Sequence, residues 1–292
     1  MPAPHLVNMR ANWAVKLARK LAAIAATVLV GGLLTAALVR MSPGFDSDER
    51  LLDARLDSAS QAAVRAEYAA NRNVARYYVH QLAAMLHGDL GESPSLRRPI
   101  AELIVDRLPV TAELMAVGVV GGWTLAFALA LPAVLCRRRL ASQIAGTFST
   151  CMLCLPPAAI AVLIFSWGGP VRVIVALVLF PRLFDYCRNL LEDAYARPHI
   201  LMARAKGLRP SRILLRHVLP VTAPQFLALA GVSVSMAFGA AIPVETLCDL
   251  PGIGQLAWKA AIARDLPVLV CLTMMITVVT QLCNSASDGA AA

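Results

Sequence analysis

Long runs of uncharged, mostly apolar residues constrain this chain more than any other feature. The four longest clear cases are Leu21–Val39, Leu114–Cys136, Val218–Val244 and Leu266–Ser287. A helix of about 20 such residues crosses a hydrocarbon core of about 30 Å. Hydrophobic residues make up 58% of the chain and charged residues 15%, whereas soluble domains average about 45–50% and about 25%. The sequence therefore predicts one all-α, polytopic membrane domain.

Two further spans are expected in the middle of the chain. The uncharged stretch Leu140–Val171 is too long for one straight span and too short for two. Pro156-Pro157 should break or kink it and Gly168–Pro170 should turn it, which leaves a third span at about Ile144–Trp167. The fourth should be one long helix that runs past Arg182 into the cytoplasm. The predicted total is six transmembrane helices.

The distribution of charge predicts the orientation of these spans. The chain carries 27 Lys and Arg against 18 Asp and Glu, a formal charge of +9. The basic residues cluster between spans, at 137–139 and 182–216, which is typical of cytoplasmic loops. Residues 1–20 are then a cytoplasmic N-terminus, 21–39 an uncleaved first helix and 40–109 an external segment, with both termini cytoplasmic. Because no basic patch is interleaved with aromatic residues, no nucleic-acid partner is expected.

One basic segment between the spans has glycine and proline at the positions typical of a helical hairpin. Gly207 suits the left-handed residue that ends a helix, and Pro210 suits the first turn of the next one. Pro220 cannot continue that second segment without losing a hydrogen bond and kinking it. Met202–Pro220 is therefore predicted to form an amphipathic hairpin at the cytoplasmic face. The alternative is an ordinary loop with positive-inside arginines.

Sequence signatures of enzyme chemistry are missing. The chain has no GxxxxGK[ST] phosphate loop, no HExxH and no GxSxG, so no catalytic residue, metal site or cofactor of its own is expected. Cys151 and Cys154 form a CxxC pair inside an apolar run and are interpreted as buried packing residues. The acids nearest the spans are Glu113 and Glu245, both expected at outward-facing span ends. Glu113 is interpreted as a helix start rather than a proton relay.

The hairpin sequence MARAKGL, followed by RHVLP, resembles the EAA loop of ABC importer permeases. The wording is most similar to the dipeptide/oligopeptide/nickel branch of that family. Leu201 stands where the motif has its leading glutamate. In that family this loop is the coupling helix that sits in a cleft of a cytoplasmic ATPase. The resemblance implies an ATPase-coupling role for Ala203, Arg204, Ala205, Lys206, Gly207, Leu208, His217, Leu219 and Pro220.

Two other stretches resemble the same family independently. One reads GDLGES and then ELIVDRLPVTAEL, and the other reads VE, PGIG and RDLP in turn. Leu266 replaces the usual tyrosine, and relatives place a longer external loop before the fourth span and a tail after the position of Asp288. The resemblance implies structural roles for Gly88, Asp89, Gly91, Arg107, Pro109, Thr111, Glu113, Glu245, Pro251, Gly252, Gly254, Arg264, Asp265 and Pro267.

Together these resemblances imply a permease subunit of an ABC importer, in a bacterial inner membrane, with a transmembrane domain over 110–292 and a coupling loop at about 182–217. Such a subunit forms the path for peptides, nickel or a similar small solute and is not itself an enzyme. The implied partners are a second homologous permease, two cytoplasmic ATPases that use ATP, an external solute-binding protein and the lipid bilayer. The alternatives are a secondary carrier or channel, or a decayed permease that acts as a membrane scaffold.

Overall fold

The computed structural model describes residues 4–41, 74–135 and 139–291. Most of these residues are helical, and none of them belongs to a strand beyond the single bridge between Glu92 and Pro99. Within the predicted external segment 40–109, the first described helix is α3 (Val74–Leu86). The chain divides into two compact units, 1–106 with 257–279 and 107–256 with 280–292. Each unit is described by itself.

The first unit is built on α1 (Pro4–Met41), α3 and the first part of α12 (Leu266–Ala291). Its apolar cluster joins Val28 and Ala36 of α1 to Tyr78 of α3 and to Val270 and Met274 of α12. The hydroxyl of Tyr78 donates a 2.7 Å hydrogen bond to the carbonyl of residue 29. These contacts hold the first predicted span against the last one.

Gly32 makes the close approach of α1 to α3 possible. A Cβ at this position would lie 2.7 Å from the Tyr78 hydroxyl and 3.1 Å from Met274 Cγ. Only a residue without a side chain leaves room for both neighbours.

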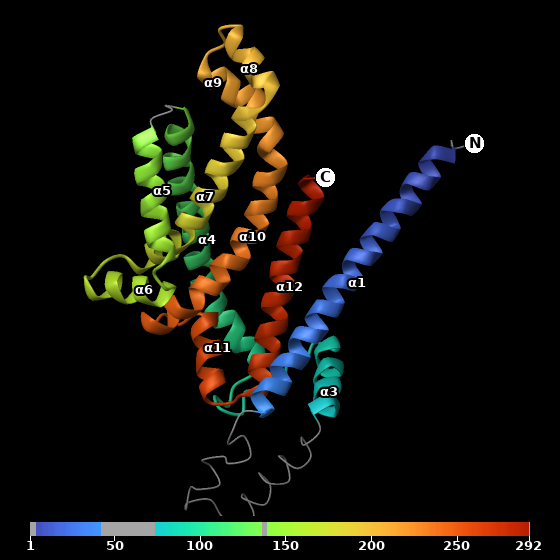
Figure 1. The fold of residues 1–292 in the computed structure, drawn as a ribbon. Helices are drawn as coiled ribbons and strands as arrows, with labels where there is room; N and C mark the ends of the chain where they lie inside the picture. Colours follow the sequence, from blue (N-terminus) through green and yellow to red (C-terminus); the bar gives the residue numbers. More distant parts are fainter. Residues whose placement is uncertain (1–3, 42–73, 136–138, 292) are drawn as a thin grey trace, which may run out of the picture. The chain divides into compact units, whose positions relative to one another are not determined.

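The second unit is organised around α7 (Ile174–Ala196), as Figure 1 shows. The side chains of Leu179, Leu183, Phe184 and Leu191 are almost completely buried in its core. The unit also contains most of α4 (Ile100–Leu135), α5 (Arg139–Leu153), α6 (Pro157–Ser166) and α10 (Leu219–Leu247). Small residues of α4 face α7, and a Cβ added to Gly118 would overlap the side chain of Val175.

The third predicted span is a bent pair of helices. The axes of α5 and α6 differ by 96° at the break around Pro156, which is extended and starts α6. Proline has no N–H to continue α5, and it pushes the preceding residue out of the helical region. Gly168, with φ +68, then turns the chain into η2 (Val171–Val173), ahead of α7. Cys151 and Cys154, predicted to be buried, are instead exposed, because they lie at the end of α5 beside the break.

Within the described residues, four helices are long and apolar enough to cross a membrane, or up to five if the bent pair counts as one span. The four are 18–39, 100–135, 210–247 and 266–287. α7 is not among these four helices, because Arg182, Asp185 and Arg188 interrupt its apolar sequence. The predicted all-α membrane fold is confirmed.

Candidate functional site

The hairpin consists of α8 (Pro198–Ala205) and α9 (Pro210–Ile213), which lie at the shared end of α7 and α10 in Figure 1. Pro198 occupies the first turn of α8, where its missing N–H leaves no hydrogen bond unmade. Gly207 has φ +72, and its N–H donates to the carbonyl of Arg204 at 2.9 Å. The next N–H, of Leu208, donates to Ala203 at 3.3 Å. This pair of bonds closes α8 and reverses the chain.

The second arm of the hairpin does not end at Pro220, and here the prediction of a separate segment was wrong. α9 passes through the π-helical turn η3 (Leu214–Val218) directly into α10. In a regular α-helix the ring of Pro220 would clash with the carbonyl four residues earlier. In the wider π turn that carbonyl is displaced, so it does not clash with the proline ring. Proline's missing N–H then leaves no regular helical hydrogen bond broken at this point. The hairpin is therefore continuous with α10.

The hairpin has a buried side and an exposed side. Ile200, Ala203, Ile213 and Val218 are buried against the core of the second unit. The guanidinium of Arg204 lies 5.2 Å from the ring centroid of Tyr195 on α7. Ala205, Lys206, Gly207 and Pro220 are exposed, and Leu208, His217 and Leu219 are partly exposed. The predicted coupling residues thus include both the residues that fix the hairpin to the bundle and the residues on its free surface.

A fully buried carboxylate organises the other end of α10. The side chain of Glu245 is 0% exposed. Its Oε1 accepts a 2.7 Å hydrogen bond from the hydroxyl of Thr111 on α4. Its Oε2 accepts backbone N–H groups of Gly254 at 2.6 Å and Gln255 at 3.2 Å, at the start of α11 (Ile253–Ile262). Glu245 thus accepts hydrogen bonds from N–H groups that a helix N-terminus leaves without a partner.

The residues around Glu245 complete a closed polar cluster. The Thr111 hydroxyl, while donating to Glu245, accepts the N–H of Ile253 at 2.7 Å. Arg107 donates to Gln255 Oε1 at 3.1 Å, and Gln255 Nε2 donates to Asp249 Oδ1 at 2.6 Å. We name Arg107, Thr111, Asp249, Glu245, Gln255 and Gly254 the Glu245 cluster. It joins α4, α10 and the start of α11.

Glycine is required at two positions beside this carboxylate. A Cβ at Gly252 would overlap the Glu245 carboxylate. A Cβ at Gly254 would lie 2.7 Å from the backbone Cα of Ile242 and 2.9 Å from Glu245 Oε2. The PGIG sequence therefore allows the backbone to approach the acid closely enough for its N–H groups to donate.

A second buried carboxylate organises the corresponding part of the first unit. Asp265 Oδ2 accepts the hydroxyls of Ser93 at 2.5 Å and Ser95 at 2.6 Å, and the Ser95 N–H at 3.2 Å. Before these serines, Gly88 and Gly91 have φ +83 and φ +78, and the Gly91 N–H donates to Asp89 Oδ1 at 2.8 Å. Two of the resembling stretches, 88–93 and 264–267, therefore meet at Asp265.

The remaining predicted residues lie outside these clusters. Pro109 is inside α4, Pro251 is exposed before α11, and Pro267 is in the first turn of α12. Arg264 has φ +54 and lies in the turn between α11 and α12. Glu113 was predicted to start a helix, but α4 begins at Ile100. The prediction was wrong because the first turns of α4 are charged and precede the apolar run that was used to place the start.

Several residues of these clusters were not predicted. Ser95, Asp249 and Gln255 supply hydrogen bonds to the two carboxylate sites. Gln255 directly follows the last glycine of PGIG, so this motif could have indicated that Gln255 lies in the site. For Asp249, which has φ +50, the only sequence indication was its position shortly before a proline-glycine pair.

Comparison with known proteins identifies the family. The model of the family "Binding-protein-dependent transport system inner membrane component" matches residues 118–292. The chain belongs to this family. Its members are permease components rather than enzymes, so the predicted absence of enzymatic activity and the predicted family are both confirmed. The match and the apolar helices make the chain a multi-pass inner-membrane protein.

Individual relatives are similar along most of their length. The oligopeptide transport permease AppB of Bacillus subtilis is 26% identical, over 88% of this chain and 90% of the relative. The glutathione transport permease GsiC of Salmonella typhimurium is 22% identical, over 92% and 94%. The nickel import permease NikB of Staphylococcus aureus strain RF122 is 23% identical, over 87% and 83%.

A solved structure gives the same fold. The inward-facing MetNI methionine ABC transporter matches with a TM-score of 0.52 at 17% identity, over 66% of this chain and 97% of the matched chain. At this identity the likeness concerns the fold. It agrees with the predicted ABC importer permease architecture.

Proposed function

We propose that this permease forms part of the path of a small solute, a peptide or similar compound, and that separate ATPases drive the path through the α8–α9 hairpin. The sequence contains no GxxxxGK[ST] phosphate loop, and in this proposal the energy arrives through a protein contact. The hairpin is the surface best suited to receive it.

The observation that carries this proposal is the apolar surface of the hairpin. Leu201 is 55% exposed, Met202 65% and Leu215 66%. They lie among exposed Lys206, Arg209 and Arg212. Basic residues keep the hairpin out of the hydrocarbon core, while large apolar side chains ringed by charge are typical of a protein contact. A cleft on a soluble partner fits both properties.

The geometry also supports transmission of movement. α7 leads into α8 at Arg197, and α9 leads through η3 into α10. Because the buried side of the hairpin packs into the core of the second unit, displacement of the hairpin displaces α7 and α10 with it. Such rigid-body movement of a helix bundle is how alternating access opens a path first on one side and then on the other.

The proposed assembly follows from the family. It contains a second homologous permease, two cytoplasmic ATPases that bind the ATP, and an external solute-binding protein. Both termini and the hairpin lie on the cytoplasmic side, and the Glu245 cluster lies on the outer side. The solute is of the kinds that the relatives are named for, oligopeptides, glutathione or nickel.

The turn at Gly207 provides the test. Gly207→Val or Gly207→Pro should abolish binding-protein-dependent uptake in proteoliposomes while membrane insertion is kept, because a side chain at φ +72 strains the turn. Gly168→Val is the matched control, since Gly168 has φ +68, equally open surroundings and no place in the hairpin. Full uptake by the Gly207 variants would refute the proposal.

Two results would favour the other functions. Uptake that survives ATP depletion and follows the membrane potential would indicate a secondary carrier. Capture of an ATPase by the hairpin without any solute flux would indicate a scaffold.

A further inference from the structure

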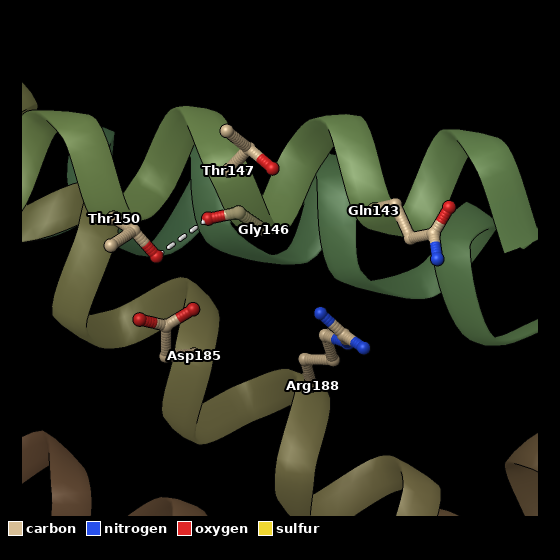
Figure 2. A pocket seen from close by; sticks show the side chains of 6 residues that line it. All are labelled: Gln143, Gly146, Thr147, Thr150, Asp185 and Arg188. Carbon is tan, nitrogen blue, oxygen red and sulfur yellow. Dashed lines mark hydrogen bonds between the residues drawn. The ribbon is translucent and has the colours of Figure 1, made fainter.

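The charged side chains between α5 and α7 find partners within the second unit. They border a polar groove of about 420 Å³, in which Figure 2 shows Asp185 and Arg188 of α7 beside Thr150 of α5. Arg188 forms an ion pair with Glu192 at 2.8 Å. Asp185 lies close to Arg188 and within hydrogen-bonding reach of Ser149. The charges of this groove are therefore balanced by neighbours in the chain.

The charges of the hairpin are not balanced in this way. The sequence contains no acid between positions 193 and 245, while basic residues recur from Arg197 to Arg216. Arg212 and Arg216 are exposed, and neither is paired with an acid among the residues that the structure describes. Leu215, also exposed, lies between them in sequence. We name Arg212, Leu215 and Arg216 the basic face, which is complementary to an acidic surface on a partner.

The π turn η3 determines which residues of this segment are buried. The N–H of Leu219 donates to the carbonyl of Leu214, five residues earlier, where an α-helix would use the carbonyl four residues earlier. Ile213, Val218 and Thr222 are all buried. Ile213 and Val218 are five positions apart, and in a regular α-helix such residues point about 140° away from each other. The additional residue of the π turn brings both of them onto the core side.

A regular helix would expose a different set of side chains. The residues one α-helical turn before Val218 are Leu214 and Leu215, so a regular helix would direct Leu215 toward the core. In the structure Leu215 is instead 66% exposed, and Ile213 occupies the buried position. The π turn thus acts as a one-residue insertion that moves Leu215 to the surface.

We infer that the π turn is a positioning element for the ATPase contact, because it presents the basic face to an apolar depression rimmed by acidic side chains on the ATPase. Leu215 fills the depression, and Arg212 and Arg216 pair with the acids. A central apolar anchor supplies much of the energy of such a contact, while the surrounding charges select the partner. This inference rests on the proposed function and deepens it, since it gives the chemistry of the partner surface.

Removal of the additional residue tests the register. Deletion of Leu214 leaves Ile213 and Val218 four positions apart, so that a regular α-helix buries both. Pro220→Ala has to accompany the deletion, because in an α-helix the proline ring would clash with the carbonyl four residues earlier. This double variant should fold, and capture of the ATPase in co-purification should fall about tenfold or more, because the apolar anchor is withdrawn from the contact.

The matched control is Pro220→Ala alone. The five-residue spacing of Ile213 and Val218 still requires the π turn in this variant, so capture should stay within about twofold of wild type. Normal capture by the double variant, together with a changed register at Leu215, would overturn the inference.

Thiol labelling measures the register without the ATPase. In a background with Cys151 and Cys154 changed to Ser, Leu215→Cys should react with a hydrophilic maleimide well above the labelling of the parent chain. The same cysteine should react about tenfold more slowly when Leu214 is deleted and Pro220→Ala is present, because it turns toward the core. Equal rates in the two backgrounds would show that the π turn does not set the register, and would overturn the inference.

Charge reversal tests the acidic rim independently of the deletion. Arg212→Glu and Arg216→Glu should each weaken capture about tenfold at low salt and less at high salt, because salt screens exposed charges. Lys259→Glu, which reverses an exposed base on α11, should leave capture within about twofold of wild type. If the arginine variants behave like Lys259→Glu, the partner surface is not acidic and the inference is overturned.

The lipid environment separates a protein partner from a membrane surface. Arg212→Glu should weaken capture equally in phosphatidylcholine nanodiscs with and without phosphatidylglycerol. A loss that appears only with phosphatidylglycerol would assign the basic face to anionic lipid and overturn the inference.

These outcomes are distinct from failure of the proposed function. If the wild-type permease captures no ATPase, the proposed function fails. If wild type captures it and the variants of the basic face do so equally well, only the positioning role fails. Thermal unfolding in detergent verifies that the double variant folds, and if it does not fold, the charge reversals decide.

Discussion

At the scale of single residues, the two buried carboxylates explain most of the resembling sequence outside the hairpin. Glu245 accepts from a hydroxyl and two backbone N–H groups, and Asp265 accepts from two hydroxyls and a backbone N–H. Buried acids of this kind are tolerated because several hydrogen-bond donors converge on each carboxylate. The glycines beside Glu245 exist for the same reason, since any side chain there would displace those donors.

Replacement of Glu245 should destabilise the protein more than replacement of an acid in an exposed ion pair. Glu245→Gln exchanges one acceptor for an NH₂ group that faces other donors, which should lower the free energy of unfolding by about 1–3 kcal/mol. Thermal unfolding in detergent measures the change. Glu113→Gln is the control, since its 3.1 Å pair with Arg172 is more than half exposed and should contribute less than about 1 kcal/mol. Equal shifts for both variants would contradict the role given to Glu245.

At the scale of elements, the sequence was informative where structure is local. Glycine and proline punctuation predicted the turn at Gly207 and the break at Pro156, because both depend on backbone conformation alone. The prediction from sequence was wrong at Pro220, where a π turn accommodates the proline within a continuous helix. It was also wrong at Glu113, where the charged segment before the apolar run is already helical. The Glu245 cluster could not be assembled from sequence, since Thr111 and Glu245 are 134 residues apart and only the packing of α4 against α10 brings them together.

The exposed face of the hairpin predicts where the ATPase binds. Met202→Asp should weaken co-purification of the ATPase about tenfold or more, because a buried methionine side chain contributes about 1.5–3 kcal/mol to a contact and a buried unpaired carboxylate opposes it. Ser211→Asp places the same charge on an exposed position of α9 that is already polar, and should leave co-purification nearly unchanged. Unimpaired capture by Met202→Asp would place the contact elsewhere.

At the scale of the whole molecule, hydrophobic runs and loop charges were sufficient to predict a polytopic all-α membrane protein, and three separate motifs were sufficient to predict its family. The polar groove between α5 and α7 was not foreseen, because its two walls are far apart in sequence and meet only through the packing of these helices.

The orientation of the chain can be measured directly. In a background with Cys151 and Cys154 changed to Ser, Lys206→Cys should react with a membrane-impermeant maleimide only after the cells are opened, because the proposed topology places the hairpin in the cytoplasm. Trp258→Cys, exposed on α11, should react in intact spheroplasts. Labelling of both positions from the same side would refute the topology and the coupling role with it.

The unbroken course from α9 through η3 into α10 has one more consequence. The proposed contact surface for the ATPase and the Glu245 cluster belong to a single helical rod, which runs from Pro210 to Leu247. If the proposed topology and coupling hold, a compound that immobilises the Glu245 end of this rod should stall nucleotide turnover on the opposite side of the bilayer. Inhibitors of such an importer could therefore act from the cell exterior, without having to enter the cell or compete with ATP.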